Sequence, residues 1–133
     1  MAPLFRKTEE QAGQEQAALA EIERLAALPA ADLAVELLPA LGAAGIPHAR
    51  AGVRVLQCCD WLLASFPRAS KFNPGQLAEP VREALQRLEH ANLVTATPHD
   101  RISLWRITRD GQSALDQQTT AQLLAGGGSG TTP

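Results

Sequence analysis

Hydrophobic positions recur with a helical period over the first third of the chain. Across residues 8–28, small and branched apolar side chains return every three or four positions, and charged residues fill the faces between them. Such a stripe is typical of an amphipathic helix that buries one side. Pro29 is a natural stop. We therefore predict a helix over 8–28 whose inward face consists of Ala12, Ala18, Leu19, Ile22, Leu25 and Ala26.

Two further helices are predicted before the middle of the chain. One begins at about Asp32, and Pro39 should end or kink it, because proline removes a backbone donor. The stretch "GAAGIPH" at 42–48 has the composition of a linker. The next helix should span 51–66. The inward faces of these two helices are predicted to hold Leu33, Leu37, Leu38 and Leu41, and then Val53, Leu56, Cys59, Leu63 and Phe66.

Helical periodicity restarts at Asn73-Pro74, where asparagine suits a cap and proline the first helical position. The proline at position 80 leaves two alternatives open. Either a short helix over 74–79 is followed by a second helix over 80–91, or 74–91 is one helix kinked at Pro80. In both cases the inward face consists of Val81, Ala84, Leu85 and Leu88.

The pattern changes to short β-like runs at "LVTAT" (93–97) and "ISLWRI" (102–107), joined by "PHDR". Together they predict a β-hairpin. A two-stranded hairpin alone is marginal in water, so it must pack on the helices. Thr108 is a suitable cap for a last helix over 109–124, and the tail from Ala125 should be flexible. The residues expected to bury the hairpin are Leu93, Val94, Ile102, Leu104 and Ile107, with Trp105 packing in the same unit.

Composition supports a fold built mainly from helices. Hydrophobic residues make up 45% of the 133 positions, but aromatic residues only 4%, and tyrosine is absent. Alanine and leucine, both strong helix formers, therefore carry most of the burial. The predicted fold class is mainly α with one β-hairpin. The net charge of −2 is unevenly spread: residues 1–45 carry −4, 46–109 carry +4 and 110–133 carry −2.

Two stretches in sequence order resemble the winged helix-turn-helix regulators of bacteria, of the MarR and PadR types. "LQRLEHANLV" (85–94) is similar to a recognition helix running into the first wing strand, and "LWRITRDGQSAL" (104–115) to the second wing strand and the following helix. The resemblance covers about residues 50–118. It implies a winged-helix domain at 47–118, an N-terminal two-helix extension at 1–46, and a helix end with a glycine-rich tail at 119–133.

This resemblance implies a DNA-binding transcriptional regulator that dimerises through its N-terminal and last helices. The apolar stripes of the N-terminal helices could equally well be buried against the protein's own winged-helix domain. Helix 80–91 would then lie in the major groove of double-stranded DNA, and the hairpin tip would contact the backbone or minor groove. Arginine suits guanine and glutamine suits adenine as partners for base edges. The candidate DNA-binding residues are Arg68, Lys71, Asn73, Arg82, Gln86, Arg87, His99 and Arg101.

A second hypothesis is a winged-helix module that binds another protein and not DNA. A helix-turn-helix has a turn of three or four residues between its helices, whereas here Glu79 meets Pro80 with almost nothing between. Glu83 and Glu89 on the outward surface would also repel phosphates. The simplest alternative is a solvated face with an ordinary Glu83–Arg87 pair. Basic residues converging on one face would favour DNA, and interspersed acids would favour the protein partner.

Other chemistry finds little support in the residue pattern. The adjacent Cys58 and Cys59 are poorly placed to bond to each other, and we expect Cys59 to be buried and Cys58 more exposed. The three histidines are scattered, without the spacing of a metal site. No catalytic motif is present. We therefore expect no cofactor, no metal and no enzymatic activity. Without a long apolar run or a signal-peptide pattern, a cytoplasmic location is expected.

Overall fold

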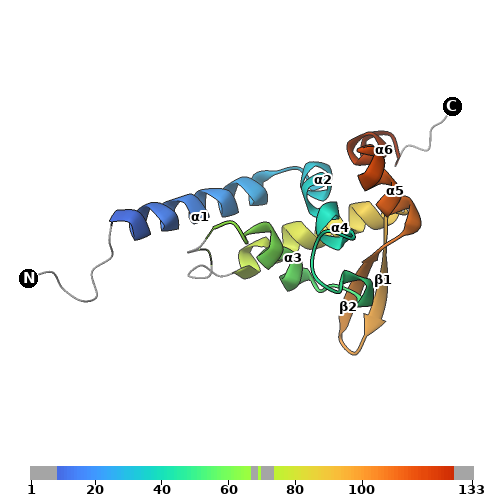
Figure 1. Cartoon of the computed structure of the whole chain (residues 1–133), viewed down its shortest axis with the longest axis horizontal. Helices are drawn as coiled ribbons and strands as arrows, with labels where there is room; N and C mark the ends of the chain where they lie inside the picture. The colour runs from blue at the N-terminus through green and yellow to red at the C-terminus, as the bar shows by residue number, and fades with distance from the viewer. Residues whose placement is uncertain (1–8, 67–68, 70–73, 128–133) are drawn as a thin grey trace, which may run out of the picture.

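The computed structural model describes residues 9–66, 69 and 74–127 (Figure 1). Within these ranges the chain is mainly helical, with one two-stranded antiparallel hairpin, as the sequence predicts. In order, the elements are α1 (Glu9–Ala27), α2 (Ala30–Leu41), η1 (Ala49–Ala51), α3 (Val55–Leu62), η3 (Pro74–Leu77), α4 (Ala78–His90), β1 (Val94–His99), β2 (Ile102–Ile107), α5 (Arg109–Gln117) and α6 (Thr120–Gly127).

The first helix, α1, lies within a residue of its predicted bounds but packs over only part of its length. Ala18, Ile22 and Leu25 are buried. The N-terminal half extends away from the rest of the protein (Figure 1), so Ala12 is exposed. Ala26 is exposed as well. The expectation that both alanines face inward is therefore wrong. At Ala12 the stripe continues past the surface that it packs against, and Ala26 lies beside the buried stripe, next to Leu25.

Arg24 joins α1 to α2 through two carboxylates. Its guanidinium donates hydrogen bonds of 2.7 and 2.9 Å to Glu21 on its own helix, and two of 2.9 Å to Glu36 on α2. These bonds hold the pKa of Glu36 below its ordinary value. A carboxyl whose pKa is lowered by folding contributes stability above its unfolded pKa, and this contribution is lost as the pH falls through its folded pKa.

We expect Glu36→Gln to destabilise the protein by less than about 1 kcal/mol at neutral pH, because the pair is solvent-exposed. The difference from wild type should vanish in acid, where Glu36 itself becomes protonated. Urea unfolding at neutral and acidic pH measures both values. Glu23→Gln, which removes an exposed carboxylate of α1 outside this cluster, is the control. An equal loss in the two variants would contradict the prediction.

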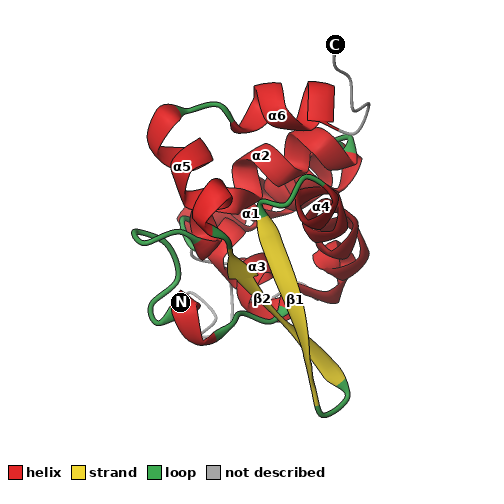
Figure 2. Ribbon diagram, turned by 90° about the vertical axis from the view of Figure 1, so that its right-hand side faces the viewer, coloured by secondary structure: helices red, strands yellow, loops and turns green. Residues whose placement is uncertain are grey.

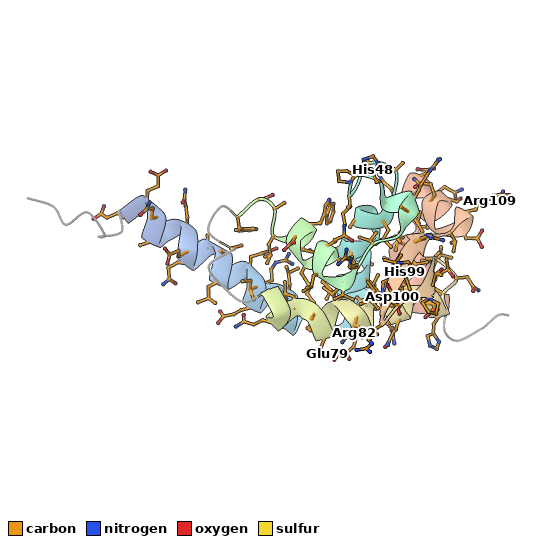
Figure 3. The ribbon with its side chains drawn as sticks, turned by 90° about the horizontal axis from the view of Figure 1, so that it is seen from below. His48, Glu79, Arg82, His99, Asp100 and Arg109 are labelled. Carbon is orange, nitrogen blue, oxygen red and sulfur yellow. The ribbon has the colours of Figure 1, made fainter. Side chains whose placement is uncertain are left out.

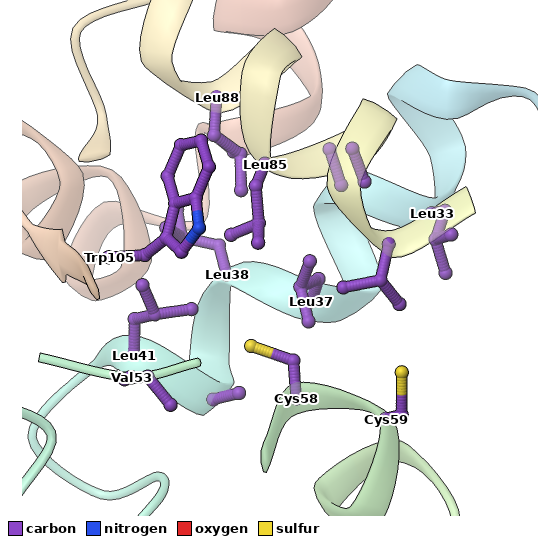
Figure 4. Close-up of a cluster of buried hydrophobic side chains, with 14 of the residues drawn as sticks. Leu33, Leu37, Leu38, Leu41, Val53, Cys58, Cys59, Leu85, Leu88 and Trp105 are labelled. Atoms are coloured by element: carbon purple, nitrogen blue, oxygen red, sulfur yellow. The ribbon is translucent and has the colours of Figure 1, made fainter. Parts of the chain in front are cut away.

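The second helix, α2, lies at the centre of the core and packs along α4. Its four leucines, predicted to face inward, are all at most 2% exposed. Figure 4 shows them meeting residues from α3, α4 and β2. The helix begins at Ala30, directly after Pro29, and not at Asp32. It also continues through Pro39 to Leu41, so the proline lies inside its last turn.

The helix predicted over 51–66 is shorter, because Val53 is used by the hairpin. Gly52 has φ +108, a conformation that favours glycine. Val53 then pairs with Trp105 of β2 in both directions, with N–H to O distances of 2.9 and 2.8 Å. Val53 is buried as predicted, but as a one-residue strand beside the hairpin. The helix α3 begins only at Val55 and ends at Leu62.

The buried side of α3 differs in part from the predicted one. Cys58 and Cys59 both lie fully within the core. The expectation that Cys58 is the more exposed of the two is wrong. Leu56, expected inside, is 54% exposed because it lies beside the buried stripe. Leu63 is buried as predicted, at 6% exposure, and Phe66 is half-buried.

Pro80 neither opens a helix nor separates two. The 3₁₀ turn η3 runs directly into α4, which starts at Ala78 and has Pro80 as its third residue. The first-turn N–H groups of a helix have no acceptor within it, so proline is tolerated there. Of the two alternatives, the separate short helix over 74–79 is therefore wrong, and the chain is closer to the other, with one continuous helical run over 74–90. The helix that precedes and packs against α4 is α3. The predicted Asn73 cap lies outside the described residues.

The hairpin has a shorter loop than predicted. The register runs from Val94 opposite Ile107 to His99 opposite Ile102, so Asp100 and Arg101 alone connect the strands. Pro98 and the histidine that follows it belong to β1 and not to the loop. Asp100 has φ +57, a left-handed conformation that aspartate tolerates better than most residues.

The register also decides which hairpin face is buried. Val94, Ala96, Trp105 and Ile107 share the face that meets the core, where Trp105 is 5% exposed. The expectation that Ile102 is buried with them is wrong: it belongs to the opposite face and is 43% exposed. Leu104 shares that opposite face and is half-buried, and Leu93, just before β1, is buried as predicted.

The last helix is broken in two. Thr108 caps α5 as predicted, with its hydroxyl oxygen accepting the Gly111 N–H at 2.9 Å. Gln118 then adopts a left-handed conformation, with φ +57, and ends the helix. The chain turns and α6 packs back on α2, burying Leu124. The prediction of one helix over 109–124 is thus wrong, and α6 extends to Gly127, into the predicted tail.

Candidate nucleic-acid interface

The hairpin is fixed to the C-terminal end of α4. Asn92, with φ +64, turns the chain, and the Leu93 N–H donates to the Leu88 carbonyl of α4 at 2.9 Å. At the other side of the hairpin base, the Thr108 N–H donates to the Leu93 carbonyl at 3.0 Å, and the Thr108 hydroxyl donates to the Asn92 carbonyl at 2.7 Å. These bonds hold the base of both strands against the helix.

The hairpin tip projects from the helical body (Figure 2). The Val53–Trp105 pairing holds its middle. Beyond that point, Pro98, His99, Asp100 and Arg101 are all exposed. The tip therefore extends into solvent from a firmly anchored base.

The side of α4 opposite the core is polar and exposed. Val81, Ala84, Leu85 and Leu88 are buried, as predicted, at 0% exposure. The residues on the other faces of the helix are solvent-accessible, and none of the described segments covers them. The exposed residues are Glu79, Arg82, Glu83, Gln86, Arg87, Glu89 and His90.

Arg82 is paired within its own helix. Its Nη1 lies 2.8 and 2.9 Å from the two carboxylate oxygens of Glu79, and both side chains are exposed (Figure 3). Glu79 was not among the predicted site residues, although the i,i+3 spacing of Glu79 and Arg82 is a signal for such a pair. An exposed pair contributes at most about 1 kcal/mol, so a phosphate could displace the carboxylate.

Gln86 and Arg87 are exposed and make no side-chain hydrogen bond within the described part of the chain. Glu83 and Arg87 are four residues apart, a spacing that allows an ion pair, but this pair is not formed. Both side chains are available to a partner without breaking an interaction. They lie on α4 together with Arg82, so the structure brings these three predicted site residues to one helix.

At the hairpin tip, His99 and Asp100 lie close together. The His99 Nε2 is 3.8 Å from an Asp100 carboxylate oxygen, an attraction that requires a protonated imidazole. Arg101 is exposed, with no ion-pair partner among residues 9–66, 69 and 74–127. The tip therefore offers one unpaired guanidinium beside one carboxylate. Three other predicted site residues, Arg68, Lys71 and Asn73, lie outside the described residues.

The charges on α4 are mixed. Glu79, Glu83 and Glu89 alternate along the exposed surface with Arg82 and Arg87. The basic residues thus do not form a continuous patch on this helix. On α4, Gln86 and Arg87 are the predicted site residues that an anionic partner could contact without breaking an ion pair, with the glutamates at their sides.

The two cysteines have no reactive setting. Burial, with a contribution from Cys59, raises the pKa of Cys58 to about 12, and burial with Asp60 nearby raises the pKa of Cys59 to about 11. Both thiols therefore stay protonated near neutral pH, and the thiolate is the reactive form. No three potential metal ligands gather among the described residues. None of the described helices is both long and apolar enough to cross a bilayer.

Comparison of the chain with models of protein families, with curated proteins and with solved structures gave no match.

Proposed function

We propose that this protein is a DNA-binding transcriptional regulator of winged helix-turn-helix architecture. The observation that carries the proposal is the anchored hairpin, which projects beside a helix whose outward face no described segment covers. In such an arrangement, a helix enters the major groove of DNA while the wing reaches the adjoining backbone. The order α3, α4, β1, β2, with Val53 as a short additional strand, supports this architecture.

In this proposal the residues take different roles. Gln86 and Arg82 contact base edges. For Arg82 this requires that its ion pair with Glu79 break. Arg87 and Arg101 contact phosphates. His99 contacts the DNA backbone or minor groove from the hairpin tip. Arg68, Lys71 and Asn73, which precede α4 in the sequence, contribute further phosphate contacts. Phosphate contacts set the position of the protein on the duplex, and base contacts supply the sequence preference.

A dimer would place two copies of α4 about 34 Å apart, one turn of the duplex. The exposed N-terminal half of α1 is the part of the first helix available for such an assembly. The last helix, α6, packs on α2 of its own chain and leaves Leu123 exposed at 43%. The dimer proposed from the N-terminal and last helices therefore depends mainly on α1.

Mobility-shift titrations on mixed-sequence duplex at two salt concentrations test the proposal. Wild type should retard DNA at low salt, with binding that weakens as salt rises. The double variant Arg87→Ala with Arg101→Ala should bind more weakly and reduce the salt slope by about two, one for each lost phosphate contact. Arg24→Gln, which removes a cation from α1, should behave as wild type. If wild type shows no retardation at low salt, DNA binding is ruled out.

The mixed charge of α4 favours a second candidate, a module that binds another protein. The two candidates differ in what the glutamates do. If α4 meets DNA, Glu83→Gln with Glu89→Gln should tighten retardation, because two repulsive charges are removed. If the variant leaves DNA binding absent or unchanged, α4 does not face DNA, and the second candidate, with a basic protein partner on this surface, is favoured.

A further inference from the structure

The tip of the hairpin carries an exposed isoleucine. Ile102, the first residue of β2, is 43% exposed, although isoleucine is among the residue types most often buried in proteins. Among the described residues, the other large hydrophobic residues with comparable exposure are Leu56 and Leu123, and both lie on helices of the body. Ile102 lies instead at the end of the hairpin, which projects into solvent (Figure 2).

The face of the hairpin that carries Ile102 is covered at its base and open at its tip. Leu104 and Arg106 share this face, which is opposite to the face that meets the core. Arg106 donates a hydrogen bond of 3.3 Å to the Ala51 carbonyl. Gly52 packs so closely on Leu104 that a Cβ atom on the glycine would lie 2.7 Å from the Leu104 Cβ. These two contacts partly bury Leu104 and Arg106, whereas Ile102 lies beyond them.

The exposed isoleucine is held on a short and firmly anchored element. Val53 exchanges two backbone hydrogen bonds with Trp105 in the middle of β2. The loop beyond Ile102 consists of Asp100 and Arg101 alone, because His99 already pairs with Ile102. A side chain fixed in this way loses little freedom on contact with a partner, so more of its contact free energy is available for binding.

The charges around Ile102 favour a polyanionic partner. Arg101, the preceding residue, is exposed and has no ion-pair partner in the part of the chain that the structure describes. His99, directly opposite Ile102, becomes a second cation when protonated. Asp100 occupies the turn position with φ +57, a conformation that aspartate tolerates. An apolar side chain beside basic residues is the combination with which many proteins insert a wedge into the minor groove of DNA.

We propose that Ile102 is an apolar wedge, which the hairpin tip inserts between two stacked base pairs from the minor groove and which thereby kinks the duplex. This inference rests on the proposed DNA-binding function and adds a deformation of the DNA to it. The free energy needed to separate stacked base pairs depends on their sequence, and pyrimidine–purine steps such as TA are easily kinked. The protein should therefore prefer such steps. A tip that acted through Arg101 alone would instead favour A-tracts, whose narrow minor groove attracts cations.

Mobility-shift titrations on two duplexes of equal length and equal AT content test the wedge, one with repeated TA steps and one with A-tracts. Wild type should bind the TA duplex at least about fivefold more tightly, because TA steps are kinked at a lower cost. Ile102→Thr keeps a β-branched residue in the strand but makes its end polar. This variant should lose the preference and still retard DNA, and Ile102→Leu should keep the preference. Leu123→Ala removes a leucine of the same 43% exposure from α6 and should behave as wild type.

Ring closure of a short DNA fragment measures the kink itself. Wild type should accelerate the ligase-catalysed closure of a mixed-sequence fragment of about 150 base pairs, roughly one persistence length. Ile102→Thr should not accelerate it. Because Ile102 is exposed, an unchanged thermal unfolding midpoint verifies that this variant is folded.

The outcomes separate the wedge from DNA binding. The wedge is overturned, and DNA binding retained, if wild type retards DNA without accelerating ring closure. The same conclusion follows if wild type binds the A-tract duplex at least as tightly as the TA duplex, or if Ile102→Thr equals wild type in either assay. If wild type retards neither duplex at low salt, the regulator and the wedge are both rejected.

Discussion

Replacing Gly111 with alanine is expected to destabilise the protein by at least about 2–3 kcal/mol, although alanine is the better helix former. A Cβ atom at this position would lie 2.0 Å from the Leu93 carbonyl oxygen and 2.7 Å from an Ile107 side-chain carbon. The nearest atom belongs to the backbone of the segment that joins α4 to β1, so a rotamer change cannot relieve the clash. The α5 helix must move away from the hairpin base.

Gly13→Ala is the matched control, because it makes the same change within a helix where a Cβ atom meets nothing within 4 Å. It should stabilise the protein by about 0.5–1 kcal/mol, through helix propensity alone. The two variants should therefore shift the urea unfolding midpoint in opposite directions. A stabilising Gly111→Ala would show that α5 does not pack so closely on the Leu93 carbonyl.

Replacing Trp105 with alanine is expected to cost about 3–5 kcal/mol, a large part of the stability of a domain of this size. The indole is 5% exposed and lies among Leu38, Leu85 and Leu88 (Figure 4). The indole connects the hairpin to α2 and α4, so its removal should weaken the packing of the hairpin against both helices. Trp61→Ala, at a partly buried position on α3, should cost clearly less.

Trp105→Phe separates packing from hydrogen bonding. The indole Nε1 is buried and has no hydrogen-bond partner in the part of the chain that the structure describes. An unsatisfied buried donor costs about 1–3 kcal/mol, which phenylalanine would relieve while retaining most of the aromatic contact. We therefore expect this variant to keep most of the wild-type stability. Thermal unfolding of the three tryptophan variants provides the comparison, and a Phe variant as unstable as the Ala variant would contradict the expectation that the indole N–H is unsatisfied and the phenyl ring keeps most of the packing.

Much of the candidate site follows from sequence spacing. The inward face of α4, with Val81, Ala84, Leu85 and Leu88, leaves Gln86 and Arg87 outside by helical geometry alone. The pairing of Arg82 with Glu79 was missed, although both residues lie on one helix. The spacing indicated a Glu83–Arg87 pair at i,i+4, but the pair that forms on this helix is Arg82 with Glu79 at i,i+3.

The sequence by itself determined the elements whose signals are local: the amphipathic stripes of α1, α2 and α4, the existence of the hairpin, and the Thr108 cap of α5. Periodicity and capping act over a few residues, so they can be read without knowing the fold. Tertiary structure alone decided the role of Val53, the buried hairpin face and the break at Gln118. Each of these depends on a contact with a segment distant in sequence, such as Trp105 for Val53 or α2 for α6. An open cavity between the 42–51 segment and α5 has the same origin, because folding brings together residues that no local pattern connects.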